Sequence, residues 1–128
     1  MTIEEALKHI NKTFKYKGDK KWFDKWTIMN EPFVGDCEDY SLTTIYYAND
    51  KSMLKFIWSI ITLKYVLYYV KTSRGEGHAI TRYNGMYFDN IQRKLVTKEK
   101  LLEDGYSVFI PLPFPFVFLK MIFGTVMK

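Results

Sequence analysis

The chain has 128 residues, of which 48% are hydrophobic, 18% aromatic and 26% charged. This composition predicts one folded domain over residues 1–128 and excludes disorder of the whole chain. Nineteen Lys and Arg against fourteen Asp and Glu give a formal charge of +5, which is too small to indicate a nucleic-acid-binding protein. The single cysteine, Cys37, excludes a disulfide framework and a zinc site made of several cysteines.

The N-terminal residues do not have the pattern of a secretory signal. Glu4 and Glu5 are carboxylates at positions where a signal peptide carries positive charge and then an apolar run. We therefore expect the protein in the cytoplasm of the cell that makes it.

The first half of the chain predicts three helices. Thr2 and Glu5 form a capping box, and apolar residues at helical spacing follow as far as Ile10. Asp36 stands where an N-cap belongs, after the loop signals of Asn30 to Gly35, and predicts a helix over 37–48. Apolar spacing predicts a further helix over 53–61.

The second half predicts mainly strands. Residues 64–71 are rich in Tyr, Val and Leu and favour a strand, and a loop with two glycines follows at 73–77. Asn84-Gly85 between two strand-like runs predicts a hairpin with a type I′ turn. Beyond it we expect a short helix over 97–104, ended by Gly105, and a last strand over 106–110. The order of elements predicts an α+β domain.

The C-terminal stretch from Val108 to Met127 is apolar and carries one charge, Lys120. Its length could span a bilayer, but Pro111, Pro113 and Pro115 cannot all sit inside a regular helix. We expect an extended segment packed over the domain and a short helix over 117–127. If this tail is exposed instead, it would indicate contact with a membrane or a protein partner such as a virion.

Residues 12–26 alternate lysines with aromatic side chains, a mixture that can bind single-stranded nucleic acid. Lysines whose stems surround core aromatics produce the same pattern. We favour the second interpretation and do not expect nucleic-acid binding.

Cys37 lies in the first turn of its predicted helix, where free N–H groups and the helix dipole favour a thiolate. Asp36, Glu38 and Asp39 surround it, and nearby anions raise the pKa of a thiol. We interpret Asp36 and Asp39 as helix-capping residues. A lone cysteine is more often core filler than a nucleophile, so both interpretations stay open on this evidence alone.

His78 begins the first hairpin strand. A two-residue turn at 84–85 places Arg82 opposite Tyr87 and His78 opposite Ile91, so that His78 and Asp89 become diagonal neighbours on one sheet face, about 7–8 Å apart along the backbone. Packing the Cys37 helix on that face would bring the thiol to the imidazole. The other histidine, His9, has no comparable setting.

Three sequence blocks carry a family resemblance. They are Gly35-Asp36-Cys37-Glu38-Asp39-Tyr40-Ser41, Gly77-His78-Ala79-Ile80 and Phe88-Asp89-Asn90. In this order, over roughly Trp22 to Gly105, the chain resembles the bacterial and phage transglutaminase-like cysteine peptidases. The chain departs from that family at Ser41, where alanine is usual, in its short length and in its Pro-rich tail.

The resemblance implies a papain-like α+β fold with Cys37 as nucleophile, His78 as general base and acid, and Asp89 as the group that orients the imidazole. The backbone N–H of Cys37 would stabilise an oxyanion, together with the side chain of Trp26 or Asn30. If the gene belongs to a phage, the expected location is the host cytoplasm.

We expect a thiol-dependent hydrolase or acyl transferase that acts on an amide of a protein, a peptide or peptidoglycan. The alternative is a catalytically silent interaction module that uses the fold and its apolar tail. We expect no cofactor and no metal, because the sequence has neither a Gly-rich phosphate loop nor grouped metal ligands.

Overall fold

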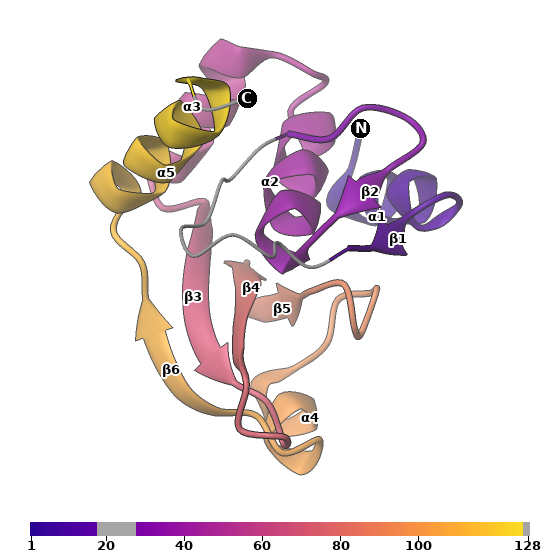
Figure 1. The fold of residues 1–128 in the computed structure, drawn as a ribbon, viewed down its shortest axis with the longest axis vertical. Coiled ribbons are helices and arrows are strands. Elements are labelled where there is room, and N and C mark those ends of the chain that lie inside the picture. The colour runs from indigo at the N-terminus through magenta and orange to yellow at the C-terminus, as the bar shows by residue number, and fades with distance from the viewer. Residues whose placement is uncertain (18–27, 127–128) are drawn as a thin grey trace.

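The computed structural model of the protein describes residues 1–17 and 28–126. Its elements follow one another along the chain as Figure 1 shows: α1 (Ile3–Asn11), β1 (Lys15–Tyr16), β2 (Val34–Gly35), α2 (Cys37–Ala48), α3 (Met53–Ile61), β3 (Tyr65–Lys71), β4 (Gly77–Tyr83), β5 (Met86–Phe88), α4 (Lys98–Glu103), β6 (Ser107–Pro111) and α5 (Phe114–Val126). Four strands form an antiparallel sheet in the order β5-β4-β3-β6, and β1 and β2 form a small parallel pair.

The helices and main strands that the sequence predicts are confirmed. Thr2 and Glu5 form the capping box of α1, and Thr97 caps α4. The pairing of β1 with β2 has no counterpart in the predictions, because two-residue strands leave no periodic pattern. The lysine-aromatic stretch predicted over 12–26 lies outside the described residues from Gly18 onward.

The hairpin has the predicted turn and the predicted register near it. Asn84 and Gly85 both have positive φ, 51° and 77°, as a type I′ turn requires, and Arg82 lies opposite Tyr87. The predicted pairing of His78 with Ile91 is wrong. β5 ends at Phe88 and a turn follows.

The two faces of the sheet pack against different clusters. Leu67 of β3 lies in the larger cluster with Leu42 and Ile45 of α2, whereas Val70 lies in a smaller one with Leu101 of α4. Successive strand residues point to opposite faces, so the sheet separates α2 from α4.

The prediction that α2 packs on the sheet face of His78 is therefore wrong. His78 pairs with Val70 across the strands, and Thr81 pairs with Leu67. Directly opposite residues share a face, so His78 lies on the side of the smaller cluster and Thr81 on the side of α2. Cys37 therefore approaches His78 from the first residues of β4, and α2 does not cover the sheet face on which the imidazole lies.

The C-terminal tail runs as β6 along β3 and then turns into α5 (Figure 1). α5 begins at Phe114, earlier than predicted, because Pro115 falls in the first turn. Amide hydrogens of a first turn have no acceptor within the helix, so proline fits there. Val117 is buried in the larger cluster and Phe118 packs against it, while Phe116 stays exposed.

No helix in the part of the chain that the structure describes combines the length and the apolar character needed to cross a bilayer.

Candidate active site

Cys37 is the first residue of α2, and a reciprocal capping box holds this helix end. Asp36 Oδ1 accepts a hydrogen bond from the backbone N–H of Asp39 at 3.1 Å, and Asp39 Oδ2 accepts one from the N–H of Asp36 at 3.4 Å. Both carboxylates thus bind backbone groups of the helix start. The position of Cys37 is consequently set by the Asp-Cys-Glu-Asp sequence itself.

The Cys37 thiol lies against the beginning of β4. Its Sγ accepts a hydrogen bond from the backbone N–H of Ala79, the residue after His78, at 3.4 Å, and donates one to Glu38 Oε2 at 3.3 Å. The side chain is almost completely buried. The contact with Ala79 brings the thiol to the strand that carries the histidine.

Asp89 is the centre of a hydrogen-bond network below the imidazole. Its Oδ2 lies 2.8 Å from His78 Nε2 and accepts a hydrogen bond from the Tyr106 hydroxyl at 2.6 Å. Its Oδ1 accepts the backbone N–H groups of Ile91 and Gln92 at 3.1 and 2.6 Å. Since Asp89 is fully buried, these four partners hold its carboxylate in one orientation, and Nδ1 of His78 is left for another partner.

The environment raises the pKa of the Cys37 thiol above its ordinary value. Burial is the largest cause, the charge of Glu38 is the next, and Asp36 adds to it, while the hydrogen bond from Ala79 opposes the shift. The sequence predicts two opposing effects on this thiol: a helix start that favours the thiolate and neighbouring carboxylates that raise the pKa. The second effect, together with burial, prevails in the resting site. Desolvation and the neighbouring carboxylates outweigh the helix dipole.

A cavity of about 480 Å³ opens beside these groups. Cys37, His78 and Tyr106 all line it, so the thiol, the imidazole and the tyrosine that binds Asp89 face one space. The remaining lining residues are Tyr16, Thr72, Ser73, Arg74, Glu76, Gly77, Asn90, Ile91, Gln92 and Asp104. This cavity offers an amide-bearing chain a route to the thiol.

The two side chains predicted for the oxyanion are not placed at the cavity. Trp26 lies outside the described residues. Asn30 is exposed and is not among the described residues that line the cavity. The Cys37 backbone N–H, the other predicted donor, has no backbone acceptor among residues 1–17 and 28–126.

Sequence reasoning missed Tyr106 and the thiol-binding role of Glu38. Tyr106 follows the Gly105 helix terminator, and no motif or spacing connects it to Asp89. Glu38 stands inside the recognised block, but its effect depends on which way its side chain turns.

Comparisons with known proteins give a structural likeness only. No family model matches the chain, and no curated protein matches it. The chain is similar to Legionella pneumophila LapG in a calcium-bound form, with a TM-score of 0.55 and 15% sequence identity over 85% of this chain. It spans 60% of the length of that LapG chain.

The LapG structure is calcium-bound, which raises the question whether the described residues of this protein could hold a metal ion. Within the described ranges of this protein, no group of three or more His, Cys, Asp or Glu side chains is placed to hold a metal ion. The described residues thus offer no such donor set. The likeness to LapG concerns the fold: the chain has a mixed α+β, transglutaminase-like fold of the papain-like kind.

Proposed function

We propose that the protein is a thiol-dependent hydrolase that cleaves amide bonds through a thioester formed on Cys37. The observation that supports this most directly is the hydrogen bond between His78 and Asp89 beside a thiol at the start of α2, with thiol and imidazole lining one cavity. A nucleophile, a base and a group that orients the base are the parts that acyl transfer to a cysteine requires.

The chemistry assigns one role to each group. Cys37 Sγ attacks the carbonyl carbon of the amide while His78 Nδ1 takes the thiol proton. The imidazolium then gives that proton to the leaving amine as the C–N bond breaks. Water, deprotonated by His78, attacks the thioester, and the carboxylic acid leaves as Cys37 regains its proton.

The raised pKa of Cys37 determines the order of events at the thiol. At rest the thiol is protonated and directs its hydrogen to Glu38. Attack therefore requires rotation of the S–H bond toward His78 and transfer of the proton during the reaction, without a preformed thiolate-imidazolium pair.

Asp89 and the helix start complete the site. Asp89 accepts the Nε2 hydrogen of His78 and thereby keeps Nδ1 toward the thiol side. The backbone N–H of Cys37 supplies a hydrogen bond to the oxyanion of the tetrahedral intermediate. The substrate class is an amide in a protein, a peptide or peptidoglycan.

Proteome-derived peptides and purified peptidoglycan are the substrates for testing this proposal. Wild-type protein should create new amino termini that mass spectrometry detects, whereas Cys37→Ala and His78→Gln should create none above background. The half-buried His9, which contacts Glu31 and does not line the cavity of Cys37, provides the control His9→Gln, which should keep wild-type activity. Products from Cys37→Ala at the wild-type level would contradict the proposal.

Cys37 is the only cysteine, so thiol alkylation reports on this site alone. A substrate that forms the thioester should protect wild-type protein from iodoacetamide, and the acyl adduct should map to Cys37. His78→Gln should lose the adduct, since the base is absent.

An interaction module without catalysis is the second candidate, and a specific observation favours it. Phe114 and Phe116 are each 39% exposed, so α5 does not bury its whole apolar surface on its own domain. Retention of partner binding by a Cys37→Ala variant, with no cleavage by wild-type protein, would support this candidate.

A further inference from the structure

The outer side of α3 carries a stripe of exposed apolar side chains. Leu54 is 83% and Trp58 67% exposed, and Ile61 continues the same stripe at helical spacing. The inner side of the helix supplies Phe56 and Ile60 to the larger core cluster. α3 is therefore apolar on both sides, unlike an amphipathic helix, which usually presents polar residues to water on its outer side.

α5 repeats this arrangement at the same end of the molecule. Val117 is buried in the cluster that contains Phe56 and Ile60, while Leu119 and Ile122 are 53% and 59% exposed. Both helices thus cover one core, and Figure 1 shows them together at the end opposite α4. We call the exposed apolar side chains of α3 and α5 the apolar end: Met53, Leu54, Trp58, Ile61, Phe114, Phe116, Leu119 and Ile122.

The chain segments that contain α3 and α5 carry charge of one sign. Residues 51–73 and 105–128, which include α3 and α5, contain no Asp and no Glu. Their charged side chains are all lysines: Lys51, Lys55, Lys64, Lys71, Lys120 and Lys128. Of those that the structure describes, none forms a salt bridge with a described residue. Asp50, the nearest carboxylate in sequence, is bound by the N-terminal amine.

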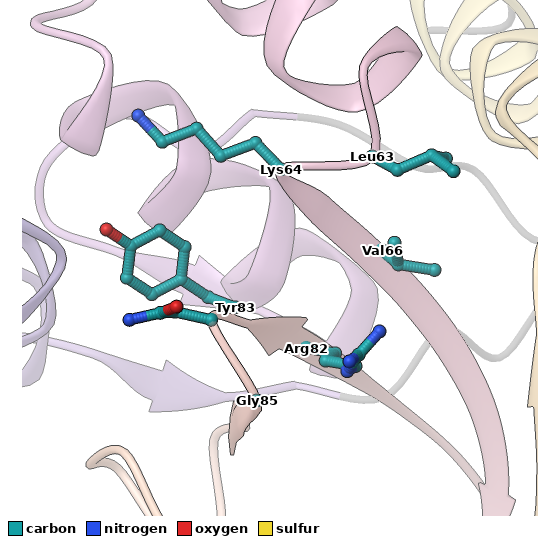
Figure 2. A pocket seen from close by; sticks show the side chains of 7 residues that line it. Leu63, Lys64, Val66, Arg82, Tyr83 and Gly85 are labelled. Atoms are coloured by element: carbon teal, nitrogen blue, oxygen red, sulfur yellow. The ribbon is translucent and has the colours of Figure 1, made fainter.

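A cavity of about 510 Å³ lies next to α3 and extends the same chemistry. Figure 2 shows Leu63 and Val66 on one side of it and Lys64 with Tyr83 on the other. Arg82 adds a second cation, and no carboxylate is among the described residues that line it. The cavity therefore combines apolar contact with positive charge, as a phosphate headgroup with its acyl chains requires.

Leu63, which lines this cavity, has a backbone conformation that is costly for leucine. Its φ is +64° and its side chain is 66% exposed. This left-handed residue ends α3, where the N–H of Lys64 donates to the carbonyl of Ser59, and it turns the leucine side chain outward.

We propose that the apolar end docks on a membrane surface that contains anionic phospholipids. Tryptophan, phenylalanine and leucine enter the boundary between headgroups and acyl chains, and lysines around them bind phosphate groups. A second copy of the chain fits less well, because symmetric contact would bring the lysines of α3 and α5 together, and neither helix carries a carboxylate to pair with them. This inference does not depend on the proposed hydrolase activity.

Vesicle sedimentation tests the proposal with the full chain. Wild-type protein should sediment with vesicles of phosphatidylglycerol and phosphatidylcholine, should stay in solution with phosphatidylcholine alone, and should be released by high salt. The variant Leu54→Gln/Leu119→Gln should bind about tenfold more weakly, because each substitution removes apolar area from the contact. Lys55→Glu should weaken binding to the anionic vesicles only.

Leu102 is the matched control. It is 52% exposed on α4, close to the exposed fraction of Leu119, but lies at the other end of the molecule. Leu102→Gln should bind as wild type, and circular dichroism should show that every variant is folded. Three results would overturn the proposal. They are equal binding by the wild type and the double variant, binding of the wild type only to vesicles of neutral lipid, and no binding of the wild type to any vesicle. A wild-type dimer that Leu54→Gln/Leu119→Gln dissociates would also overturn it and assign the apolar end to a second copy.

Discussion

Tyr106 donates its hydroxyl hydrogen to Oδ2 of Asp89 over 2.6 Å, and the same oxygen binds His78 Nε2. The tyrosine ring also meets the imidazole edge-on, with centroids 6.0 Å apart at 83°. Burial, followed by the charge of Asp89, raises the pKa of Tyr106, so the hydroxyl stays protonated and remains a donor. Tyr106 thus fixes both the carboxylate and the ring that it orients.

We predict that Tyr106→Phe lowers kcat/KM about tenfold, which corresponds to the loss of about 1–1.5 kcal/mol from one hydrogen bond to a charged group. The fall should be in kcat, with KM almost unchanged, because the hydroxyl positions the base and does not bind substrate. Tyr83→Phe is the control, since the Tyr83 ring stacks on Tyr65 and does not line the cavity of Cys37. A loss of thermal stability without a change in kcat would show that Tyr106 is only structural.

Glu38 accepts the thiol hydrogen of Cys37, and its charge raises the pKa of that thiol. Replacing Glu38 by glutamine removes the negative charge, so the pKa of Cys37 should fall and the thiolate fraction at neutral pH should rise. We predict faster alkylation by iodoacetamide for Glu38→Gln than for wild type at neutral pH. The two rates should converge at high pH, where both thiols are ionised.

Glu103→Gln replaces an exposed carboxylate that does not line the cavity of Cys37; it is the control for this prediction and should alkylate as wild type. Slower or unchanged alkylation of Glu38→Gln would show that the charge of Glu38 does not raise the pKa of Cys37. The wild-type rate should keep rising with pH beyond the ordinary range of a thiol, because its pKa is raised.

The fold was predictable where the sequence carries local signals. Asp36, as the N-cap, indicates the start of α2, and Asn84-Gly85 determines both the turn and the register of the hairpin next to it. These features depend on neighbouring residues in the chain, so spacing and residue type determine them.

Relationships across the fold were harder to predict. Period-two alternation places His78 and Asp89 near each other, but it does not say which face of the sheet α2 covers, and the predicted face was wrong. The contact of Tyr106 with Asp89 joins residues from different strand ends, and the protonation of Cys37 depends on burial. The spacing of neighbouring residues predicts neither the burial of the Cys37 thiol nor the contact between Tyr106 and Asp89.

Asp36 caps α2 through Oδ1, and the residue is buried. We predict that Asp36→Ala lowers the free energy of unfolding by about 1–2 kcal/mol, because the N–H of Asp39 loses its acceptor. Asp36→Ser keeps an oxygen at the cap and should recover most of that loss. Urea denaturation measures both values, and equal stability of the alanine and serine variants would contradict the capping role.

Gly35 precedes the cap and has no room for a side chain. A Cβ at this position would lie 2.7 Å from Asp39 Oδ2 and 2.8 Å from the sulfur of Met29. Because Asp39 Oδ2 is the atom that accepts the N–H of Asp36, we predict that Gly35→Ala both strains the packing and displaces the capping box. The expected loss is about 1–3 kcal/mol of unfolding free energy.

Gly85→Ala separates this steric effect from backbone strain. Gly85 has φ of +77° and nothing within 4 Å of an added Cβ, so alanine there should cost about 1 kcal/mol through the backbone alone. Urea denaturation and Cys37 alkylation should be measured on both variants. Gly35→Ala should change the alkylation rate, because Cys37 begins the disturbed helix, whereas Gly85→Ala should leave the rate unchanged. A Gly35→Ala variant with wild-type stability and alkylation would show that the helix start tolerates the methyl group.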